Sequence, residues 1–414
     1  MSRQFVVIIA ARFAPVVLAV GLTAALGLEI YGVLRLYLAE ASLAVGIVFA
    51  GFVPAYVARQ HQSAGTSVRG AWLYLCLATV IAASVVLLVG NTSSVFAAVG
   101  MVLAVTLMNA VESQAIFQRK PVNSAATALF GMTVLNLSYW IANLVWSGKP
   151  DTSVIAATTL SIISLTCYHI FWLSNRSAAL VDKHSHDGIR SAVVAIHEVW
   201  GWVRWQGEYM AGAAALAFYV NLVPVLLGRL YGPEAVALAT LSISVGTLFS
   251  FVPTRFLLIN LSSLRSGGKD QPFGLRPDIL RNLARVRLLS VIGGAVVLIG
   301  ALTFSGMFGI DPAMRWSAFG YLVYPLASTF VGPCSTVLTQ IGGAALTRRN
   351  ALVGCGGFLA MVGLVAVFLP QSQMAFGLCY LFGRVGNDLL DAISMRKFSG
   401  GAVSLSIWEG IGND

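Results

Sequence analysis

Long apolar segments dominate this chain and constrain its fold more than any other feature. Each is about 20 residues long, the length that a helix needs to cross a hydrocarbon core about 30 Å thick, and short polar breaks separate them. Only 10% of the 414 residues are charged and 57% are hydrophobic, whereas soluble domains carry about 25% charged residues. The sequence therefore predicts an all-α polytopic membrane protein.

We predict twelve membrane-spanning segments, and counts of eleven or thirteen fit the same pattern. The first segment lacks a small-residue cleavage site and is followed by further spans, so we expect a retained helix rather than a signal peptide. The twelve predicted segments are 4–26, 32–57, 71–90, 95–117, 123–145, 153–173, 205–227, 235–260, 287–308, 315–338, 351–369 and 374–394.

Lysine and arginine collect in alternate connections, which marks those connections as cytoplasmic. Both termini are then expected in the cytoplasm. The net charge of +10 lies largely where it would meet anionic headgroups, so we expect no nucleic-acid partner. The intervening connections hold only Lys149, Arg229 and Arg315. The basic connections hold Arg59 and Arg69; Arg119 and Lys120; Arg176, Lys183 and Arg190; Arg265, Lys269, Arg276, Arg281, Arg285 and Arg287; Arg348 and Arg349; and Arg396 and Lys397.

Two of these connections are long. Residues 174–204 have apolar positions at helical spacing, which predicts an amphipathic interfacial helix that joins two lobes. Residues 262–285 are rich in Gly, Pro and Arg and are expected to form a solvated loop. The predicted organisation is a first lobe at 1–173, a linker at 174–204, a second lobe at 205–395 and a cytoplasmic tail at 396–414.

An internal repeat supports this division into lobes. Tyr31 and Gly32 open the second predicted span, and Tyr231 and Gly232 open the eighth, each pair followed by Val-Pro and an arginine near the far end of the span. An even number of spans separates the copies, so the halves would be parallel and related by an axis along the membrane normal. Chance among common membrane residues is the alternative. Such two-lobed bundles bind substrate between their lobes and work by alternating access.

The residues that open these spans resemble a known family. Leu-Glu-Ile-Tyr-Gly at 28–32, with Arg59, and Leu-Gly-Arg-Leu-Tyr-Gly-Pro-Glu at 227–234 are similar to the multidrug/oligosaccharidyl-lipid/polysaccharide exporter superfamily. The likeness is greatest to its O-antigen and exopolysaccharide flippases, whose twelve spans fit better than the fourteen of the peptidoglycan-precursor branch. The resemblance implies two six-helix lobes in a V shape around a central cavity.

The resemblance also implies a function. It implies a flippase that moves an undecaprenyl-diphosphate-linked oligosaccharide from the cytoplasmic to the periplasmic leaflet of the bacterial inner membrane, for polysaccharide biosynthesis. The implied partners are this substrate, membrane lipids, H⁺ or Na⁺ as coupling ion, and polysaccharide polymerase and assembly proteins. No phosphate-binding glycine loop is present, so we expect a gradient-driven transporter rather than an ATP-hydrolysing enzyme.

Ionisable residues within the spans are our candidate substrate-binding residues, because each costs about 2.5 to 3.5 kcal/mol at a helix centre. Arg12 lies about 12 Å below the cytoplasmic surface, where its guanidinium could hold diphosphate oxygens. Glu40 is expected at a similar height, so an Arg12–Glu40 ion pair is an equal alternative. The full candidate set is Arg12, Glu40, Arg384, Asp388, Arg255 and Glu208.

Three of the ionisable residues in the last span fall on one face. Arg384, Asp388 and Asp391 are spaced i, i+4 and i+7, which favours an intrahelical Arg384–Asp388 pair over a cavity-lining or proton-coupling role. Glu208 and Arg255 lie near span ends, where headgroup contact is the simpler interpretation. Arg35 is also near a span end and has the same interpretation.

The remaining patterns predict no catalytic residue, metal site or cofactor. The five cysteines fall in or beside spans without metal-ligand spacing, as small apolar residues do. Two other functions stay open. A multidrug exporter of the same superfamily would favour carboxylates for cationic drugs, and a membrane-embedded polymerase or acyltransferase is the third possibility, although the short periplasmic connections do not favour it.

Overall fold

The structure is a computed structural model, and it describes residues 3–49, 68–90, 94–117, 121–146, 149–170, 190–260, 277–304, 312–332, 334–340 and 343–400. Within these residues the chain forms thirteen helices and no strand. A helix satisfies its own backbone hydrogen bonds, as a chain in a bilayer must. Every predicted span overlaps a helix, and the predicted all-helical fold is therefore confirmed.

Four helical stretches are long and apolar enough to cross a membrane by themselves. Six further apolar helical stretches in the described residues are shorter, at 10–17 residues. The four long stretches are Leu28–Val48, Pro233–Thr254, Ile279–Gly300 and Ala344–Phe368.

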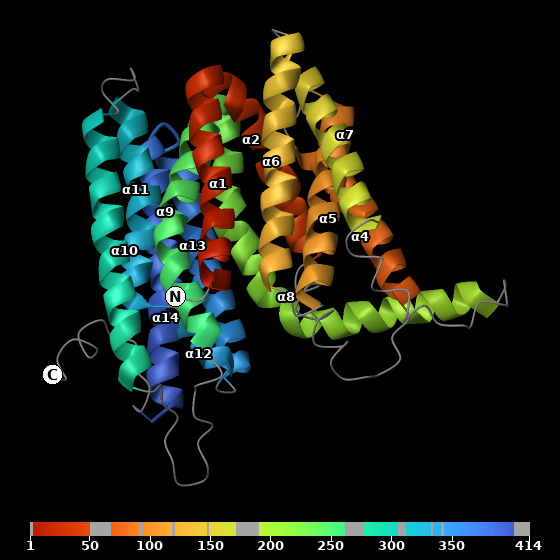
Figure 1. The fold of residues 1–414 in the computed structure, drawn as a ribbon. Coiled ribbons are helices and arrows are strands. Elements are labelled where there is room, and N and C mark those ends of the chain that lie inside the picture. Colours follow the sequence, from red (N-terminus) through yellow and green to blue (C-terminus); the bar gives the residue numbers. More distant parts are fainter. Residues whose placement is uncertain are drawn as a thin grey trace. The chain divides into compact units, whose positions relative to one another are not determined.

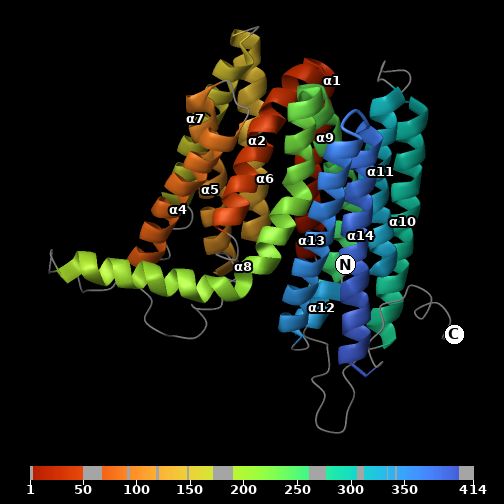
Figure 2. The same cartoon turned by 180° about the vertical axis from the view of Figure 1, so that it is seen from behind.

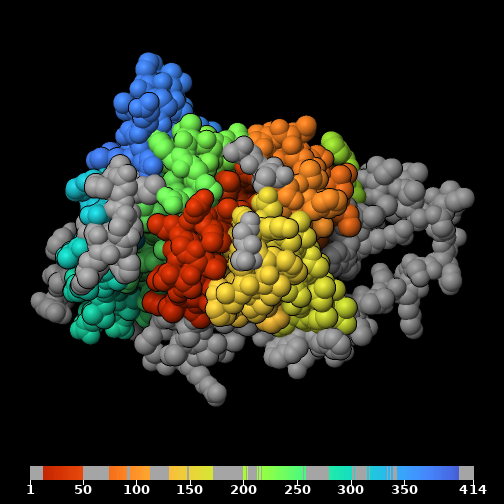
Figure 3. Space-filling model, turned by 90° about the horizontal axis from the view of Figure 1, so that it is seen from above, coloured from red at the N-terminus to blue at the C-terminus, as the bar shows by residue number. Residues whose placement is uncertain are grey.

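The helices form two compact units that divide between Arg229 and Leu230. In the first unit α2 packs against α1, α4, α5 and α7, and α6 packs against α1, α5 and α7. Figure 3, which looks along the helices, shows α1 in red against the yellow of α6. The helices of this unit are α1 (Arg3–Leu26), α2 (Leu28–Val48), α4 (Val68–Val89), α5 (Val95–Phe117), α6 (Pro121–Val145), α7 (Pro150–Tyr168) and α8 (Arg190–Tyr231).

The second unit is built around the contact between its α11 and α14. Helix α9 packs on α10 and α11, and α13 packs on α14; Figures 1 and 2 show these helices running side by side. The helices of this unit are α9 (Pro233–Asn260), α10 (Pro277–Phe304), α11 (Pro312–Val331), α12 (Cys334–Gln340), α13 (Ala344–Phe368) and α14 (Gln373–Phe398).

Helix α8 differs from the expectation at 174–204. The second part of the predicted linker and the predicted seventh span form one continuous helix, Arg190–Tyr231, which changes direction along its length in Figure 1. Residues 171–189 lie outside the described part of the chain. The predicted lobe boundaries on either side of a linker at 174–204 stay a prediction.

Two glycines with positive φ mark equivalent turns in the two units. Gly27 (φ 83°) precedes α2 and Gly232 (φ 88°) precedes α9, a backbone region that glycine enters without steric cost. Gly32, which the sequence repeat aligned with Gly232, lies buried inside α2. The turns therefore match with an offset five residues larger than the repeat suggested, because 232 minus 27 is 205 rather than 200.

A third positive-φ glycine divides a span that the sequence predicted as continuous. Gly332 (φ 91°) separates α11 from the short α12 within predicted segment 315–338. The last turn of α11 leaves carbonyl groups without helical partners. Arg287 supplies them, since its Nε donates to the Thr329 carbonyl at 2.7 Å and its Nη2 donates to that of Phe330.

Arg287 is therefore buried, although its neighbours in the sequence suggested an exposed position in a cytoplasmic connection. It follows a basic run that was assigned to a cytoplasmic connection, yet its side chain is only 1% exposed. Arginines 281 and 285 on the same helix are exposed, as expected of that run. The cause is helical phase: Arg287 is on the face of α10 that packs against α11.

Candidate functional site

Arg384 and Asp388 come together in the second unit through a tyrosine from another helix. Arg384 Nη2 donates to the hydroxyl of Tyr324 on α11 at 2.8 Å, and that hydroxyl donates to Asp388 Oδ2 at 3.4 Å. The guanidinium carbon also lies 4.8 Å from the Tyr324 ring centroid, within the range of a cation–π interaction. Arginine, tyrosine and carboxylate thus form one relay.

Close approach of α11 and α14 places this relay. A Cβ at Gly320 would collide with the backbone carbonyl of Gly377, so only glycine permits the two backbones to meet there, as small residues do in membrane helix packing. Tyr380 then lies edge-on to Tyr324, with ring centroids 5.5 Å apart, and edge-on to Tyr321 at 5.2 Å. All three rings are buried, and they pack together as an aromatic cluster beside Arg384.

One turn further along α14, Asp391 belongs to a separate polar cluster. Asn350 on α13 donates from its amide to Asp391 Oδ1 at 2.9 Å and to Ser394 Oγ at 2.9 Å. Asn387 donates to Asp391 Oδ2 at 3.4 Å. Asp391 is 2% exposed, so these donors replace water around a buried carboxylate. The shared face predicted for Arg384, Asp388 and Asp391 therefore splits into a relay and a helix-packing contact.

The first unit contains a second relay, which involves an arginine that the sequence did not favour. Arg35 on α2 is 7% exposed, its guanidinium carbon lies 4.9 Å from the ring centroid of Tyr31, and it hydrogen-bonds the Tyr31 side chain. The Tyr31 hydroxyl in turn donates to Asn136 Oδ1 on α6 at 3.2 Å. Among the described residues no carboxylate pairs with Arg35.

Glu40 lies on the same helix but faces a different neighbour. It is 3% exposed, and a Cβ at Gly90, which directly follows α4, would lie 3.0 Å from its Oε2. Nearby, the Tyr37 hydroxyl donates to Asp151 Oδ1 at 3.0 Å and accepts the Ser94 backbone N–H at 3.1 Å. These contacts join α2 to the adjoining ends of α4, α5 and α7.

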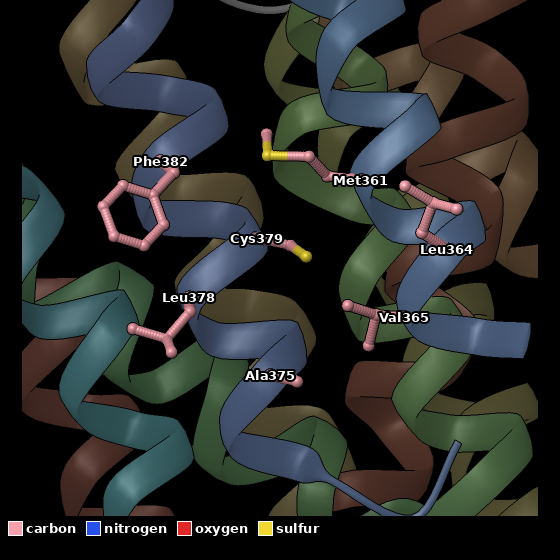
Figure 4. Close-up of a pocket in the computed structure, with 7 residues that line it drawn as sticks. All are labelled: Met361, Leu364, Val365, Ala375, Leu378, Cys379 and Phe382. Atoms are coloured by element: carbon pink, nitrogen blue, oxygen red, sulfur yellow. The ribbon is translucent and has the colours of Figure 1, made fainter. Parts of the chain in front are cut away.

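An apolar groove between α13 and α14 is separate from both relays. Its volume is about 300 Å³, and Figure 4 shows side chains from the two helices along it. The lining offers no charged group that could recognise a phosphate or a glycan. Its residues are Met361, Leu364, Val365, Ala375, Leu378, Cys379 and Phe382.

No family model and no curated protein matches the sequence. Solved structures do match the fold. The chain covers 88% of the lipid II flippase MurJ in an inward closed conformation with 95% of its own length, at a TM-score of 0.63 and 12% identity. It matches the eukaryotic MATE transporter AtDTX14 over 97% of both chains (TM-score 0.52, 11% identity) and a MATE in complex with MaD5 over 96% of this chain and 94% of that one (0.52, 13%).

The chain has the fold of the flippase MurJ and of these MATE transporters. It is accordingly a multi-pass membrane protein. Identities this low concern the fold alone, so the superfamily likeness drawn from the sequence is confirmed at that level. The closer likeness to O-antigen and exopolysaccharide flippases, the bacterial inner membrane and the cytoplasmic termini stay predictions.

Within this fold, the structure describes the side chains of only half of the candidate residues. Those of Glu40, Arg384 and Asp388 are placed as above. The side chains of Arg12, Glu208 and Arg255 lie outside the described part of the structure, so the alternatives for Arg12, a diphosphate site or a pair with Glu40, both stay predictions.

The packing of α2 also explains why the sequence did not predict the burial of Arg35. Its distance from the span end predicts depth in the membrane, but burial depends on which way α2 turns. The available signal was the pair Tyr31 and Arg35 at i, i+4, a spacing that brings two side chains together on one helix face. Among the described residues no group of three or more His, Cys, Asp or Glu side chains could hold a metal ion.

Proposed function

We propose that this protein moves an anionic, diphosphate-linked lipid, with an oligosaccharide headgroup, across its membrane. The observation that carries the proposal is Arg35, a cation 7% exposed within a membrane-spanning helix. Its described partners are the Tyr31 ring and hydroxyl, both neutral. A buried charge without an opposite charge is costly, and an anionic cargo would supply the missing charge.

The chemistry of the site suits a phosphate. A guanidinium presents several N–H donors in a planar fork that matches phosphate oxygens. The Tyr31 ring packs against the guanidinium of Arg35, and the Tyr31 hydroxyl donates its proton to Asn136. The fold match to a lipid II flippase at a TM-score of 0.63 supports a lipid-linked cargo, and the undecaprenyl carrier comes from the sequence resemblance.

The test is translocation by the purified full-length protein in proteoliposomes. A fluorescent polyprenyl-diphosphate oligosaccharide is placed in the membrane, and dithionite quenching reports the fraction in each leaflet. We expect the wild type to equilibrate the lipid, Arg35→Gln to lose at least about 90% of the rate, since a buried charged contact is worth about 2 kcal/mol, and Arg35→Lys to retain part of it. Arg285→Gln, an exposed arginine of α10, is the matched control. Unimpaired translocation by Arg35→Gln would refute the role of Arg35.

A second candidate function has a specific observation in its favour. Glu40 is a carboxylate only 3% exposed, and a cationic drug would be drawn to such a group. Two solved MATE transporters also share the fold at TM-scores of 0.52. Ethidium efflux from the same vesicles, in the absence of lipid translocation, would favour this exporter function instead.

A further inference from the structure

Asp388 is placed to compete with an external anion for Arg384. The two charges lie one helical turn apart on α14 and share the Tyr324 hydroxyl, which accepts from Arg384 at 2.8 Å and donates to Asp388 at 3.4 Å. The longer of the two contacts is the one to the carboxylate. Ser328 on α11 gives Asp388 another hydrogen bond, so the carboxylate keeps a donor even when Arg384 turns to another anion.

The relay is also not completely enclosed by the protein. Arg384, Asp388 and Ser328 are each partly exposed, in contrast to the buried Tyr324 beneath them. At about 100° per residue, the exposed side chains of Phe382 and Ile393 lie on the opposite side of α14. The polar face is thus turned away from the apolar face that a lipid environment would cover.

We propose that Arg384 is a second phosphate-binding residue and that Asp388 is its internal counter-ion. When phosphate binds Arg384, it displaces Asp388, which keeps its hydrogen bond with Ser328. This assignment rests on the proposed function, since it supplies the same diphosphate-bearing cargo with a contact in the second unit. Asp388 lowers the cost of burying Arg384 while the site is empty. It also weakens phosphate binding, which allows the cargo to leave.

Binding to the full-length protein in detergent micelles tests the assignment without translocation. Farnesyl diphosphate is the probe, farnesol lacks its charge, and inorganic pyrophosphate lacks its lipid; intrinsic fluorescence reports the dissociation constant. Asp388→Asn removes the competing charge, and we expect it to bind farnesyl diphosphate about tenfold more tightly, which corresponds to about 1.4 kcal/mol. Farnesol binding should not change. A similar gain for pyrophosphate would identify free phosphate compounds, rather than the lipid alone, as ligands of Arg384.

A second variant predicts the opposite sign. Ser328→Ala removes the donor that remains to Asp388 in the occupied state, so the carboxylate should hold Arg384 more strongly and the probe should bind about threefold more weakly. Asp388→Asn binding that is unchanged or weaker than that of the wild type, or no diphosphate binding by any variant, would overturn the assignment.

The two proposals fail separately. Lipid translocation by the wild type, with Asp388→Asn affinity unchanged, removes the counter-ion role and leaves the proposed function intact. Tighter diphosphate binding by Asp388→Asn, without lipid translocation, keeps the site and removes the proposed cargo.

Discussion

Each unit of the protein packs an arginine against a tyrosine, but the two relays end on different groups. In the first unit Arg35 and Tyr31 lead to the amide oxygen of Asn136; in the second, Arg384 and Tyr324 lead to the carboxylate of Asp388. Among the described residues, the same donor arrangement therefore ends on a neutral amide in one relay and on a charged carboxylate in the other. Under the proposed function, an anion would therefore meet no competing carboxylate at Arg35 among the described residues, but would compete with Asp388 at Arg384.

The largest effect on stability should come from removing the charge of Arg384 in the second unit's relay. Arg384→Gln leaves Asp388 without its opposite charge, and breaking such a pair costs about 3 kcal/mol in the free energy of unfolding. Denaturation of the purified protein by SDS titration in mixed micelles measures this. The double variant Arg384→Gln, Asp388→Asn should recover most of the loss, and equal stability of the single and double variants would show that the two charges are not coupled.

Removing the charge of Arg35 in the first unit's relay should not destabilise the protein. Arg35→Gln removes a buried charge that has no described carboxylate partner, so the free energy of unfolding should stay unchanged or rise by up to about 2.5 kcal/mol. The same titration checks this, with Arg285→Gln as the exposed control. A loss of stability as large as that of Arg384→Gln would mean that Arg35 is paired, and the comparison would fail.

This contrast marks the limit of what the sequence could predict. The apolar spans and the i, i+4 spacing of Arg384 and Asp388 are local patterns, and the predicted proximity of these two residues matches the structure. Tyr324 is sixty residues from Arg384 and reaches it only because Gly320 and Gly377 let α11 and α14 approach closely. No periodicity within a single span encodes that contact.

Burial around the helix axis was equally hard to predict. Hydropathy gives the depth of Arg35 and Arg287 along a helix, but the residues around Arg35 are mostly apolar and Arg287 follows the exposed Arg285 by two positions, so neither pattern reveals which face packs. Arg35 was interpreted as a boundary residue and Arg287 as part of a basic connection, yet both are buried. Their roles depend on Tyr31 and on the end of α11, which only the packed structure brings to them.

The tyrosine hydroxyls offer a smaller and more selective comparison. Tyr324→Phe keeps the ring beneath Arg384 but removes the hydroxyl that connects two charged groups, and hydrogen bonds to charged groups are worth about 2 kcal/mol. We expect a loss of that size in the free energy of unfolding. Unchanged stability would indicate that Arg384 and Asp388 interact without the hydroxyl.

The smallest effect should follow from the equivalent change in the first unit. Tyr31→Phe keeps the cation–π contact with Arg35, and its hydroxyl donates to a neutral amide, Asn136, which is 1% exposed and keeps its own bond to the Met132 carbonyl at 2.7 Å. The hydroxyl also accepts from Arg35, as that of Tyr324 accepts from Arg384, so the two variants differ in the acceptor that they leave unsatisfied. One unsatisfied neutral acceptor costs about 1 kcal/mol, measurable by the same titration. If Tyr31→Phe costs as much as Tyr324→Phe, the charge of the terminal acceptor does not distinguish the relays. A larger loss of stability for Tyr324→Phe than for Tyr31→Phe would show that the charge of Asp388 matters, because an arginine donates to the tyrosine in both relays.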